Sequence, residues 1–379
     1  MNYLIDSVSC RWQRYWTMTR RVLYLVVLVL LGSLSIKPPA VFAQPRSTLD
    51  TYASVLDSLM RTADVPGISF AFFSSEGVLF EYAQGVKGKG SREPVGAETV
   101  FEAASISKPV FAVLVQSLVE EGVIDVTRPL AHYVDPVPEV SYDTRSSALT
   151  PEMLLSHQGG LPNWRARINL EARTLDELFS VEDTLRFISD PGTAYGYSGE
   201  GFLLLQRVIE DLTSESLETL TAARIFDPLA MTRTSFSFNA TAEKDYALGH
   251  SQDGQPNKFG LRASLSSSSL HTTAGDLARF GTYLANNIGI EGPLALLIEP
   301  VVSVDEKDDV RFSWGLGFGV VDTPTGRYIY HGGNNVIFIA DFIYSLEEDL
   351  GYVLLTNSAN GIEMVRPLEE RVFGRWLWR

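Results

Sequence analysis

Apolar residues fall into short blocks with a strand-like composition near both ends of the chain. Residues 67–85 contain two such blocks around a turn at 74–77, just after Pro66. Residues 312–333 and 336–358 contain two further pairs, around the turns DTPTG and SLEEDLG. Because strands occur at both ends with a different pattern between them, we expect one antiparallel sheet assembled from the two ends of the chain.

Between these blocks the apolar residues recur at helical spacing, which predicts a mixed α/β (α+β) fold. The sheet part is expected over about 44–104 and 305–379, flanked by helices, with an inserted and mainly helical lobe over about 105–304. Residues 44–379 would then form a single domain. Helices are predicted over 47–63, 108–122, 180–192, 199–216 and 272–287, over a short segment within 150–164, and over the C-terminal residues 361–379.

Residues 1–43 have the pattern of an export signal. A basic start precedes an apolar run of about 15 residues at 22–36, and small residues before Gln44 supply a cleavage site. Met18 would be the more usual starting residue. An uncleaved membrane anchor is the alternative, although the apolar run is short for a membrane span. We expect an exported, periplasmic or extracellular protein, attached to a membrane only if this segment is retained.

Composition and charge narrow the classes of function. Of 379 residues, 45% are hydrophobic, which is ample for a large buried core. Cys10 is the single cysteine and precedes the apolar run, so the processed chain would have no disulfide and no thiolate metal site. Of 31 basic and 46 acidic side chains, residues 1–43 hold five and one, which leaves 26 against 45 and a net charge of −19. Such a surface repels nucleic acid, so no nucleic-acid partner is expected.

Ser105 and Lys108 are the first candidates for chemistry. They stand three residues apart at the start of a predicted helix, where positions i and i+3 share a face. A serine hydroxyl is a weak nucleophile until a base removes its proton, and a buried lysine with a lowered pKa can be that base. The helix N-terminus would also favour developing negative charge. Taken alone, however, the spacing favours a capped helix start with a solvated lysine.

Two further motifs follow along the chain. Tyr197 lies in the loop PGTAYGYSG between two predicted helices, where a phenol near an ammonium would lose its proton more easily and relay protons. Taken alone, such a tyrosine would simply pack its ring and bond a carbonyl. His331 ends a predicted strand, and Gly332 and Gly333 after it leave room for a substrate backbone. The next backbone N–H could form an oxyanion hole with that of Ser105.

In this order, Ser-x-x-Lys, Tyr-Ser-x and His-Gly-Gly resemble the active site of the serine β-lactamase and penicillin-binding-protein family. The likeness is greatest to class C β-lactamases and their relatives: family VIII esterases, D-aminopeptidases and D-alanyl-D-alanine carboxypeptidases. It covers most of residues 47–358, including the segments LTPEMLLSHQGGLPNW, PGTAYGYSGEGFLLLQRVIE and YHGGNNVIFIADFIY. The resemblance implies a β-lactamase/transpeptidase-like fold.

The resemblance also implies a role for each matching residue. Ser105 would be the nucleophile and Lys108 its base. Tyr197 would relay protons to the leaving group and later help to activate water, and His331 would assist from the strand. The backbone N–H groups of Ser105 and Asn334 would form the oxyanion hole. The remaining substrate-binding positions would be Gly199, Gly332, Gly333 and Asn335.

Some positions depart from the family's pattern. Gly199 replaces an asparagine that contacts the substrate amide and the lysine, which argues against efficient β-lactam turnover. The segment beginning at His331 replaces Lys-Thr-Gly, and a neutral imidazole holds a substrate carboxylate less firmly than an ammonium does. Serines within 266–269 also replace the family's Ala-Gly-Gly segment.

We therefore predict an exported serine hydrolase that acts through an acyl-serine on esters or amides, as an esterase or a peptidase-like enzyme. Its partner would be a small-molecule or short-peptide substrate. A β-lactamase or D-alanyl-D-alanine carboxypeptidase is one alternative. A penicillin- or peptidoglycan-binding module without turnover is another. The sequence does not indicate an oligomeric state.

Other polar and aromatic residues are assigned structural roles. His157 is interpreted as structural, because no Gly-x-Ser-x-Gly elbow is present for it to serve. The acidic segment 304–310 lacks EF-hand order and is interpreted as a solvated loop. Trp164 and Phe338 would either line the cleft or pack in the core. No metal or cofactor is expected, because metal-ligand spacing is absent among His132, His250 and His271.

Overall fold

Strands from both ends of the chain join in one sheet, as predicted. The computed structural model describes residues 46–165, 169, 172–178, 184–257, 262–289 and 292–377. The export signal predicted over 1–43 lies outside these residues. The strands of the large sheet are β1 (Gly67–Ser74), β2 (Gly77–Gly85), β7 (Val302–Lys307), β8 (Val310–Trp314), β9 (Gly319–Thr323), β10 (Gly326–Asn334), β11 (Ile339–Ser345) and β12 (Leu350–Thr356).

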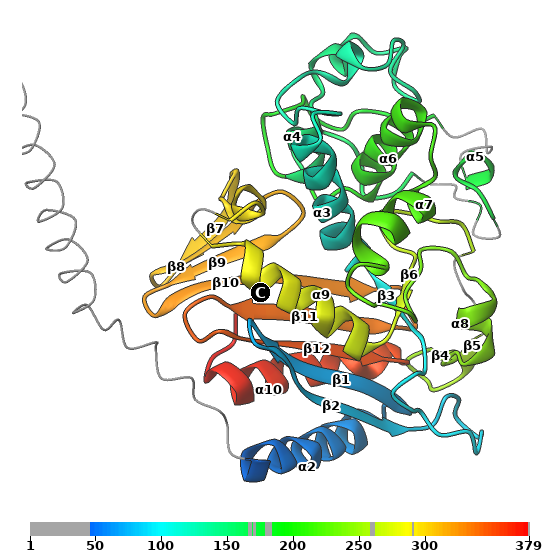
Figure 1. Cartoon of the computed structure of the whole chain (residues 1–379), viewed down its shortest axis with the longest axis vertical. Coiled ribbons are helices and arrows are strands. Elements are labelled where there is room, and N and C mark those ends of the chain that lie inside the picture. The colour runs from blue at the N-terminus through cyan, green and yellow to red at the C-terminus, as the bar shows by residue number, and fades with distance from the viewer. Residues whose placement is uncertain are drawn as a thin grey trace, which may run out of the picture. The chain divides into compact units, whose positions relative to one another are not determined.

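The strand order of this sheet is β2-β1-β12-β11-β10-β9-β8-β7, and every neighbouring pair is antiparallel. The joint between the two ends of the chain is the β1–β12 pair, in which Ile68 stands opposite Thr356 (Figure 1). Two small antiparallel sheets pair β3 (Phe101–Ala104) with β6 (Leu270–Thr272), and β4 (Gly249–His250) with β5 (Pro256–Asn257).

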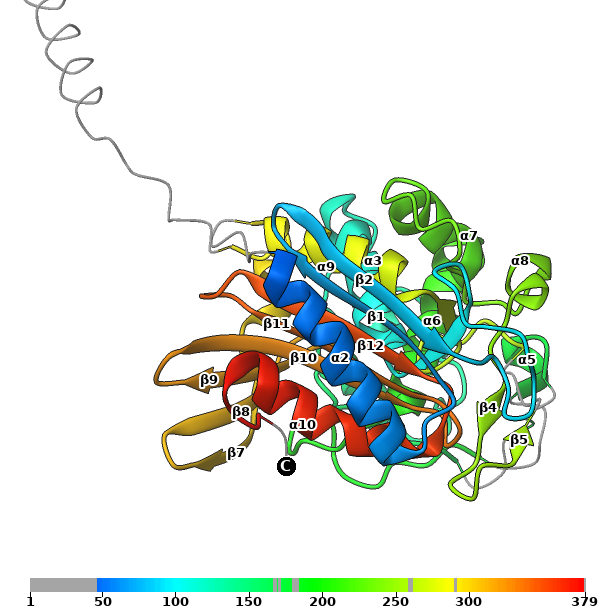
Figure 2. The same cartoon turned by 90° about the horizontal axis from the view of Figure 1, so that it is seen from below.

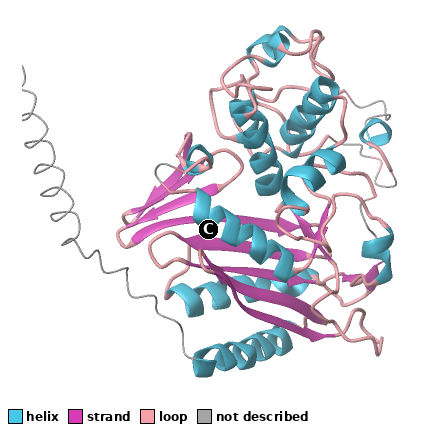
Figure 3. Cartoon of the chain, viewed as in Figure 1, coloured by secondary structure: helices cyan, strands magenta, loops and turns pink. Residues whose placement is uncertain are grey.

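Helices cover both faces of the large sheet and form the lobe (Figure 3). Figure 2 shows α2 and α10 on one face, with α9 and the lobe on the other side. The helices are α2 (Arg46–Ala63), α3 (Ser107–Glu120), α4 (Pro151–Leu155), α5 (Leu175–Leu178), α6 (Gly199–Thr213), α7 (Leu217–Thr221), α8 (Ala240–Lys244), α9 (Ala274–Asn287) and α10 (Ile362–Phe373).

The continuous apolar run of β1 is explained by helices on both of its faces. Successive strand side chains point to opposite faces. Phe72 contacts Tyr52 of α2, with ring centroids 4.8 Å apart, whereas Phe73 stacks on Phe342 at 5.4 Å. Phe342 in turn packs on Phe280 of α9, on the opposite face. Every residue of β1 is therefore buried.

α9 belongs to the sheet layer rather than to the lobe. It packs on β1, β2 and β12, and a Cβ at Gly281 would stand 2.5 Å from the ring of Phe73. Its start is capped by Thr273, because Thr273 Oγ1 accepts a hydrogen bond from the N–H of Asp276 at 3.2 Å. The helical segment expected over 105–304 thus supplies one helix to the sheet.

Three local predictions were wrong. Acidic residues 304–310 form part of the β7–β8 hairpin rather than a solvated loop, with the turn at Asp308 and Asp309. β7 is the sheet edge, where charged side chains are common, so its polarity concealed a strand. Residues 312–333 hold parts of three strands rather than two, because a turn with Gly317 at φ 83° separates β8 from β9. The described residues of the helix predicted over 180–192 are not helical.

Candidate active site

β3 brings Ser105 to the boundary between the sheet and the lobe. The strand ends at Ala104, which has a φ of 50°, and α3 begins only at Ser107. Ser105 therefore precedes the helix in a tight turn instead of opening it as predicted. Ser107 Oγ stabilises the turn by donating to the carbonyl of Ala104 at 2.6 Å and accepting from the N–H of Leu270 at 2.9 Å. A non-glycine residue at positive φ costs free energy that such contacts must offset.

Lys108 reaches back across this turn to Ser105. Its Nζ lies 3.2 Å from Ser105 Oγ and 2.8 Å from the carbonyl oxygen of Ser267, and only 1% of the residue is exposed. No salt bridge among the described residues reaches this amine. Burial without a counter-charge lowers the pKa of Lys108 to about 7. A solvated lysine beside a helix cap, the alternative raised by the spacing, does not describe this site.

The serines at 266–269 shape the site through their backbone. The carbonyl of Ser267 accepts from Lys108, and the carbonyl of Ser268 accepts from Asn335 Nδ2 at 3.1 Å. Their neighbours attach the segment to the lobe, because Ser266 Oγ donates to the carbonyl of Phe202 at 3.0 Å. The segment therefore holds an acceptor against Lys108 and is itself fixed to the lobe and to Asn335.

Tyr197 packs over Lys108, with the lysine Nζ 4.8 Å from the centre of its ring. Burial raises the pKa of Tyr197, and a hydrogen bond with Ser105 lowers it only in part. The expectation that a nearby ammonium would ease loss of the phenol proton is therefore wrong, because burial outweighs the other effects and Lys108 is itself only partly charged near pH 7. Tyr197 is a neutral phenol that can donate a proton.

His331 lies near Tyr197, with ring centroids 6.2 Å apart. Its Nδ1 donates to the carbonyl of Gly332 at 2.8 Å, and its buried Nε2 has no partner among the described residues. Burial, together with the positive field of Lys108, lowers the pKa of His331 to about 3. The ring is therefore neutral and offers an acceptor nitrogen rather than a positive charge.

His157 supports the Tyr197 loop. Its Nδ1 accepts the backbone N–H of Ser198 at 3.0 Å, and its ring lies 4.3 Å from that of Tyr197. Burial holds the pKa of His157 well below its usual range. These contacts agree with the structural role predicted for it. Of the two aromatic candidates, Phe338 packs in the core against Phe101.

Gly199 lies at the start of α6 and packs closely against Asn163 and Trp164. Its N–H donates to Asn163 Oδ1 at 3.0 Å, and a Cβ at this position would stand 2.8 Å from the carbonyl oxygen of Asn163. The ring of Trp164 would lie 3.5 Å from the same Cβ. Asn163 and Trp164 thus occupy the space beside Gly199.

Glu102 is a site residue that the sequence reasoning missed. It lies on β3, fully buried, where its Oε1 accepts from the hydroxyl of Tyr246 and its Oε2 from Asn335 Nδ2, each at 2.6 Å. Burial raises the pKa of Glu102 to about 7. The carboxyl joins the nucleophile strand to the end of β10. An acidic residue within the apolar block FEAA was the available signal.

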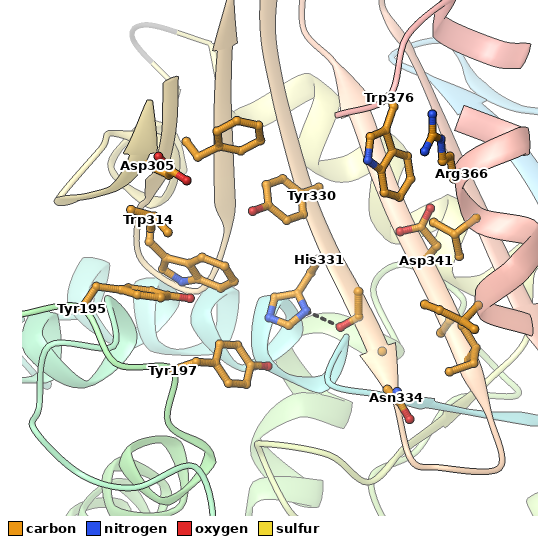
Figure 4. Close-up of a pocket in the computed structure, with 18 residues that line it drawn as sticks. Tyr195, Tyr197, Asp305, Trp314, Tyr330, His331, Asn334, Asp341, Arg366 and Trp376 are labelled. Carbon is orange, nitrogen blue, oxygen red and sulfur yellow. Dashed lines mark hydrogen bonds between the residues drawn. The ribbon is translucent and has the colours of Figure 1, made fainter. Parts of the chain in front are cut away.

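A cavity of about 760 Å³ is lined in part by Tyr197, whose ring centre lies 4.8 Å from Lys108 Nζ. Figure 4 shows Tyr197 and His331 pointing into the same region from the lobe and from β10. The predicted site residues that line the cavity are Tyr197, His331, Gly332, Gly333 and Asn334. Those that do not line it are Ser105, Lys108, Gly199 and Asn335.

The close approach of β10 to β3 explains why residue 333 is a glycine. A Cβ at Gly333 would stand 2.3 Å from the carbonyl oxygen of Ala103. Only glycine lets the two strands approach so closely. The end of β10 and the turn at Ser105 are thereby held together, so that the backbone of Asn334 and the serine belong to one site.

Metal-binding clusters and membrane-spanning helices are both absent from the described residues. No group of three or more His, Cys, Asp or Glu side chains in these residues could hold a metal ion. No helix in this part of the chain is long and apolar enough to cross a membrane.

Comparison with known proteins places these features in context. A family model described as Beta-lactamase matches residues 53–373. A β-lactamase of Escherichia coli K12 is 25% identical over 215 residues, which are 55% of this chain and 54% of the relative. Esterase EstB of Burkholderia gladioli is 25% identical over 243 residues, 60% of this chain and 61% of the relative. The chain thus matches 54% and 61% of the lengths of these two relatives.

A solved structure shares the fold. D-alanine carboxypeptidase AmpC from Burkholderia cenocepacia superposes with a TM-score of 0.69 at 22% identity, covering 86% of this chain and 98% of that one. At this identity the likeness concerns the fold alone.

Proposed function

Because the chain belongs to the Beta-lactamase family, we propose that it is a serine hydrolase in which Ser105 forms an acyl intermediate. The contact between Lys108 and Ser105 carries this proposal. A buried amine with its pKa lowered to about 7 lies 3.2 Å from the serine oxygen, which is the arrangement of a base and its nucleophile.

In the acylation step, Lys108 Nζ takes the proton of Ser105 as Oγ bonds to the substrate carbonyl carbon. The backbone N–H groups of Ser105 and Asn334 stabilise the negative oxygen that results. Tyr197 gives its phenol proton to the leaving group as the bond to the carbonyl carbon breaks. The proton held by Lys108 then restores the phenol. Water releases the acyl group by the same transfers in reverse.

We propose ester or amide substrates of small-molecule or short-peptide size, with esterase or peptidase-like activity. The neutral His331 is poorly suited to a substrate carboxylate. The close packing at Gly199 leaves no side chain there for the amide of a β-lactam. Among the relatives, the esterase EstB supports an ester substrate. β-Lactamase or D-alanyl-D-alanine carboxypeptidase activity is the alternative within the family.

A fluorophosphonate probe followed by intact mass measurement tests the nucleophile. One adduct is expected on the native chain, and none on Ser105→Ala. Labelling of Ser105→Ala at the native rate would contradict the assignment. Turnover of p-nitrophenyl esters, D-amino-acid p-nitroanilides and nitrocefin then ranks the activities. An adduct without multiple turnover on any substrate would favour a binding module.

A further inference from the structure

The cavity beside Ser105 extends across the edge of β10. β9 pairs with β10 only as far as Tyr330, so the residues from His331 to Asn334 pair on the β11 side alone. Tyr197, which contacts Ser105, forms one end of the cavity together with His331 and Trp314. Asp341 and Trp376 lie at the other end, near α10 (Figure 4). A substrate bound at Ser105 can therefore extend past the strand into a second compartment.

Asp341 is a buried carboxyl on the wall of this second compartment. It stands on β11 directly opposite Gly332, and cross-strand partners share a face of the sheet. Because Gly332 has no side chain, β10 does not cover the carboxyl on that face. Asp341 Oδ2 accepts from the hydroxyl of Tyr352 at 2.6 Å. Its Oδ1 is buried and has no hydrogen-bond partner among the described residues.

The carboxyl of Asp341 has no cationic side chain paired with it among the described residues. Only 1% of the residue is exposed, and no salt bridge in the described part of the chain includes it. The cation that lines the cavity is Arg366, whose Nε donates to Glu370 at 2.8 Å and whose guanidinium lies over Trp376. Burial raises the pKa of Asp341 to about 7, and the hydrogen bond from Tyr352 opposes this shift only in part. A buried carboxylate is stabilised mainly by a paired cation.

We propose that Asp341 binds an organic ammonium group of the substrate, so that the enzyme acts on esters or amides of amino compounds. This inference rests on the proposed hydrolase function, because it extends the same site. An ammonium N–H would satisfy Oδ1, and Tyr330 contributes an aromatic wall to the same cavity, which suits a cation. The cavity walls carry only the carboxylates of Asp305 and Asp341, fewer than a bound metal ion would need.

The strand geometry sets the length of the substrate. Asn334 and Gly332 are two residues apart along β10, and Asp341 is one strand away. At about 3.3 Å per residue and 4.8 Å between strands, this in-plane separation is roughly 8 Å. Asp341 lies on the face of the sheet opposite to that of His331, because His331 pairs with Phe342 and Gly332 pairs with Asp341. The substrate must therefore also pass around the edge of β10, so roughly 8 Å is the minimum distance between the ammonium and the reacting carbonyl. The acyl chain must therefore be longer than the roughly six to eight carbons that would span the in-plane separation alone.

The first experiment compares p-nitrophenyl esters of ω-aminoalkanoic acids with esters whose terminal ammonium is replaced by methyl. We expect kcat/KM to favour the amino ester, and Asp341→Asn to reduce this preference tenfold or more. Glu369→Gln is the matched control. Glu369 is a buried acid near Asp341 that does not line the cavity, and burial raises its pKa to about 9, so a neutral amide should leave the preference within about twofold. A preference unchanged in Asp341→Asn would overturn the proposal.

A binding measurement separates this inference from the proposed function. On a Ser105→Ala background, tryptophan fluorescence follows the binding of hexylamine, with 1-hexanol as the neutral comparison. Hexylamine should bind more tightly than hexanol, and Asp341→Asn should remove the difference. Val365→Phe, which narrows the same compartment and keeps the carboxyl, should weaken hexylamine binding as well. Asp341-dependent amine binding without ester turnover would defeat the hydrolase alone, whereas ester turnover with equal binding of amine and alcohol would defeat the ammonium site alone.

Discussion

The protonation of Lys108 is controlled by its surroundings. The amine contacts Ser105 Oγ and the carbonyl of Ser267 and is otherwise enclosed, which lowers its pKa to about 7. Only the free amine can accept the serine proton. At the scale of single residues, the reactivity proposed for Ser105 therefore depends on burial of its neighbour rather than on a charged partner.

The first prediction concerns the pH dependence of acylation. The rate should rise as pH increases through about 7 and then level off, because the base form of Lys108 accumulates. Lys108→Arg should lower the rate by about 10²- to 10⁴-fold, since a guanidinium stays protonated. Stopped-flow measurement of p-nitrophenol release between pH 5 and 9 gives the pH profile of the native chain and the rate of Lys108→Arg. A pH-independent rate in the native chain would argue against Lys108 as the base.

The same group makes stability depend on pH in a defined direction. The unfolded lysine has a pKa near 10.4, so between about pH 7 and 10 the unfolded state binds more protons than the folded state. The free energy of unfolding of the native chain, relative to Lys108→Met, should therefore rise with pH in this window, by at most about 1.4 kcal/mol per unit. Urea unfolding of both proteins at pH 7, 8.5 and 10 measures the difference. A difference that falls with pH would contradict the lowered pKa.

Introducing the family's asparagine at position 199 should not produce β-lactam turnover. The new Cβ would stand 2.8 Å from the carbonyl of Asn163, so the loop at Asn163 or the start of α6 must move. We expect Gly199→Asn to lose about 1–3 kcal/mol of stability without gaining nitrocefin hydrolysis. Thermal unfolding and nitrocefin assays test this. A gain in nitrocefin turnover at unchanged stability would show that the asparagine fits.

Among the elements, the contact between β3 and β10 decides whether the site exists. β3 supplies Glu102 and leads into Ser105, while β10 supplies His331 and leads into Asn335, whose amide donates to Glu102. These strands belong to different sheets. They are held together by that hydrogen bond and by the absence of a side chain at Gly333.

Gly333→Ala tests this contact between elements. The added Cβ would meet the carbonyl of Ala103 at 2.3 Å, a backbone atom that cannot rotate away. We expect a loss of about 2–4 kcal/mol in the free energy of unfolding, and at least a hundredfold loss of esterase activity. Gly289→Ala is the control, because a Cβ there meets no atom within 4 Å. Equal effects of the two substitutions would contradict the close approach.

At the scale of the whole molecule, the remaining prediction concerns the chain's processing. An apolar run at 22–36 and small residues before Gln44 predict export with cleavage. N-terminal sequencing of the protein from the periplasm or medium should begin at Gln44. Recovery in the membrane fraction with an intact N-terminus would support the retained anchor instead.

The sequence alone determined the broad fold and the order of the motifs. Strand blocks at both chain ends, the β1–β2 turn and the α9 cap follow from local patterns that tertiary structure did not override. β7 was missed because an edge strand can be as polar as a loop. The described residues of the helix predicted over 180–192 are not helical, although Leu185 and Phe187 are buried as the apolar pattern indicated.

Only the tertiary structure decided the chemistry. Burial lowers the pKa of Lys108 to about 7, raises that of Tyr197 and lowers that of His331, and burial depends on residues far apart in the sequence. Local spacing placed Lys108 near Ser105, but it could not show whether water would reach the amine. Asp341 likewise became a candidate ligand only when β11 placed it opposite Gly332. The charge that a side chain carries depends on its solvation, and solvation is a property of the folded molecule.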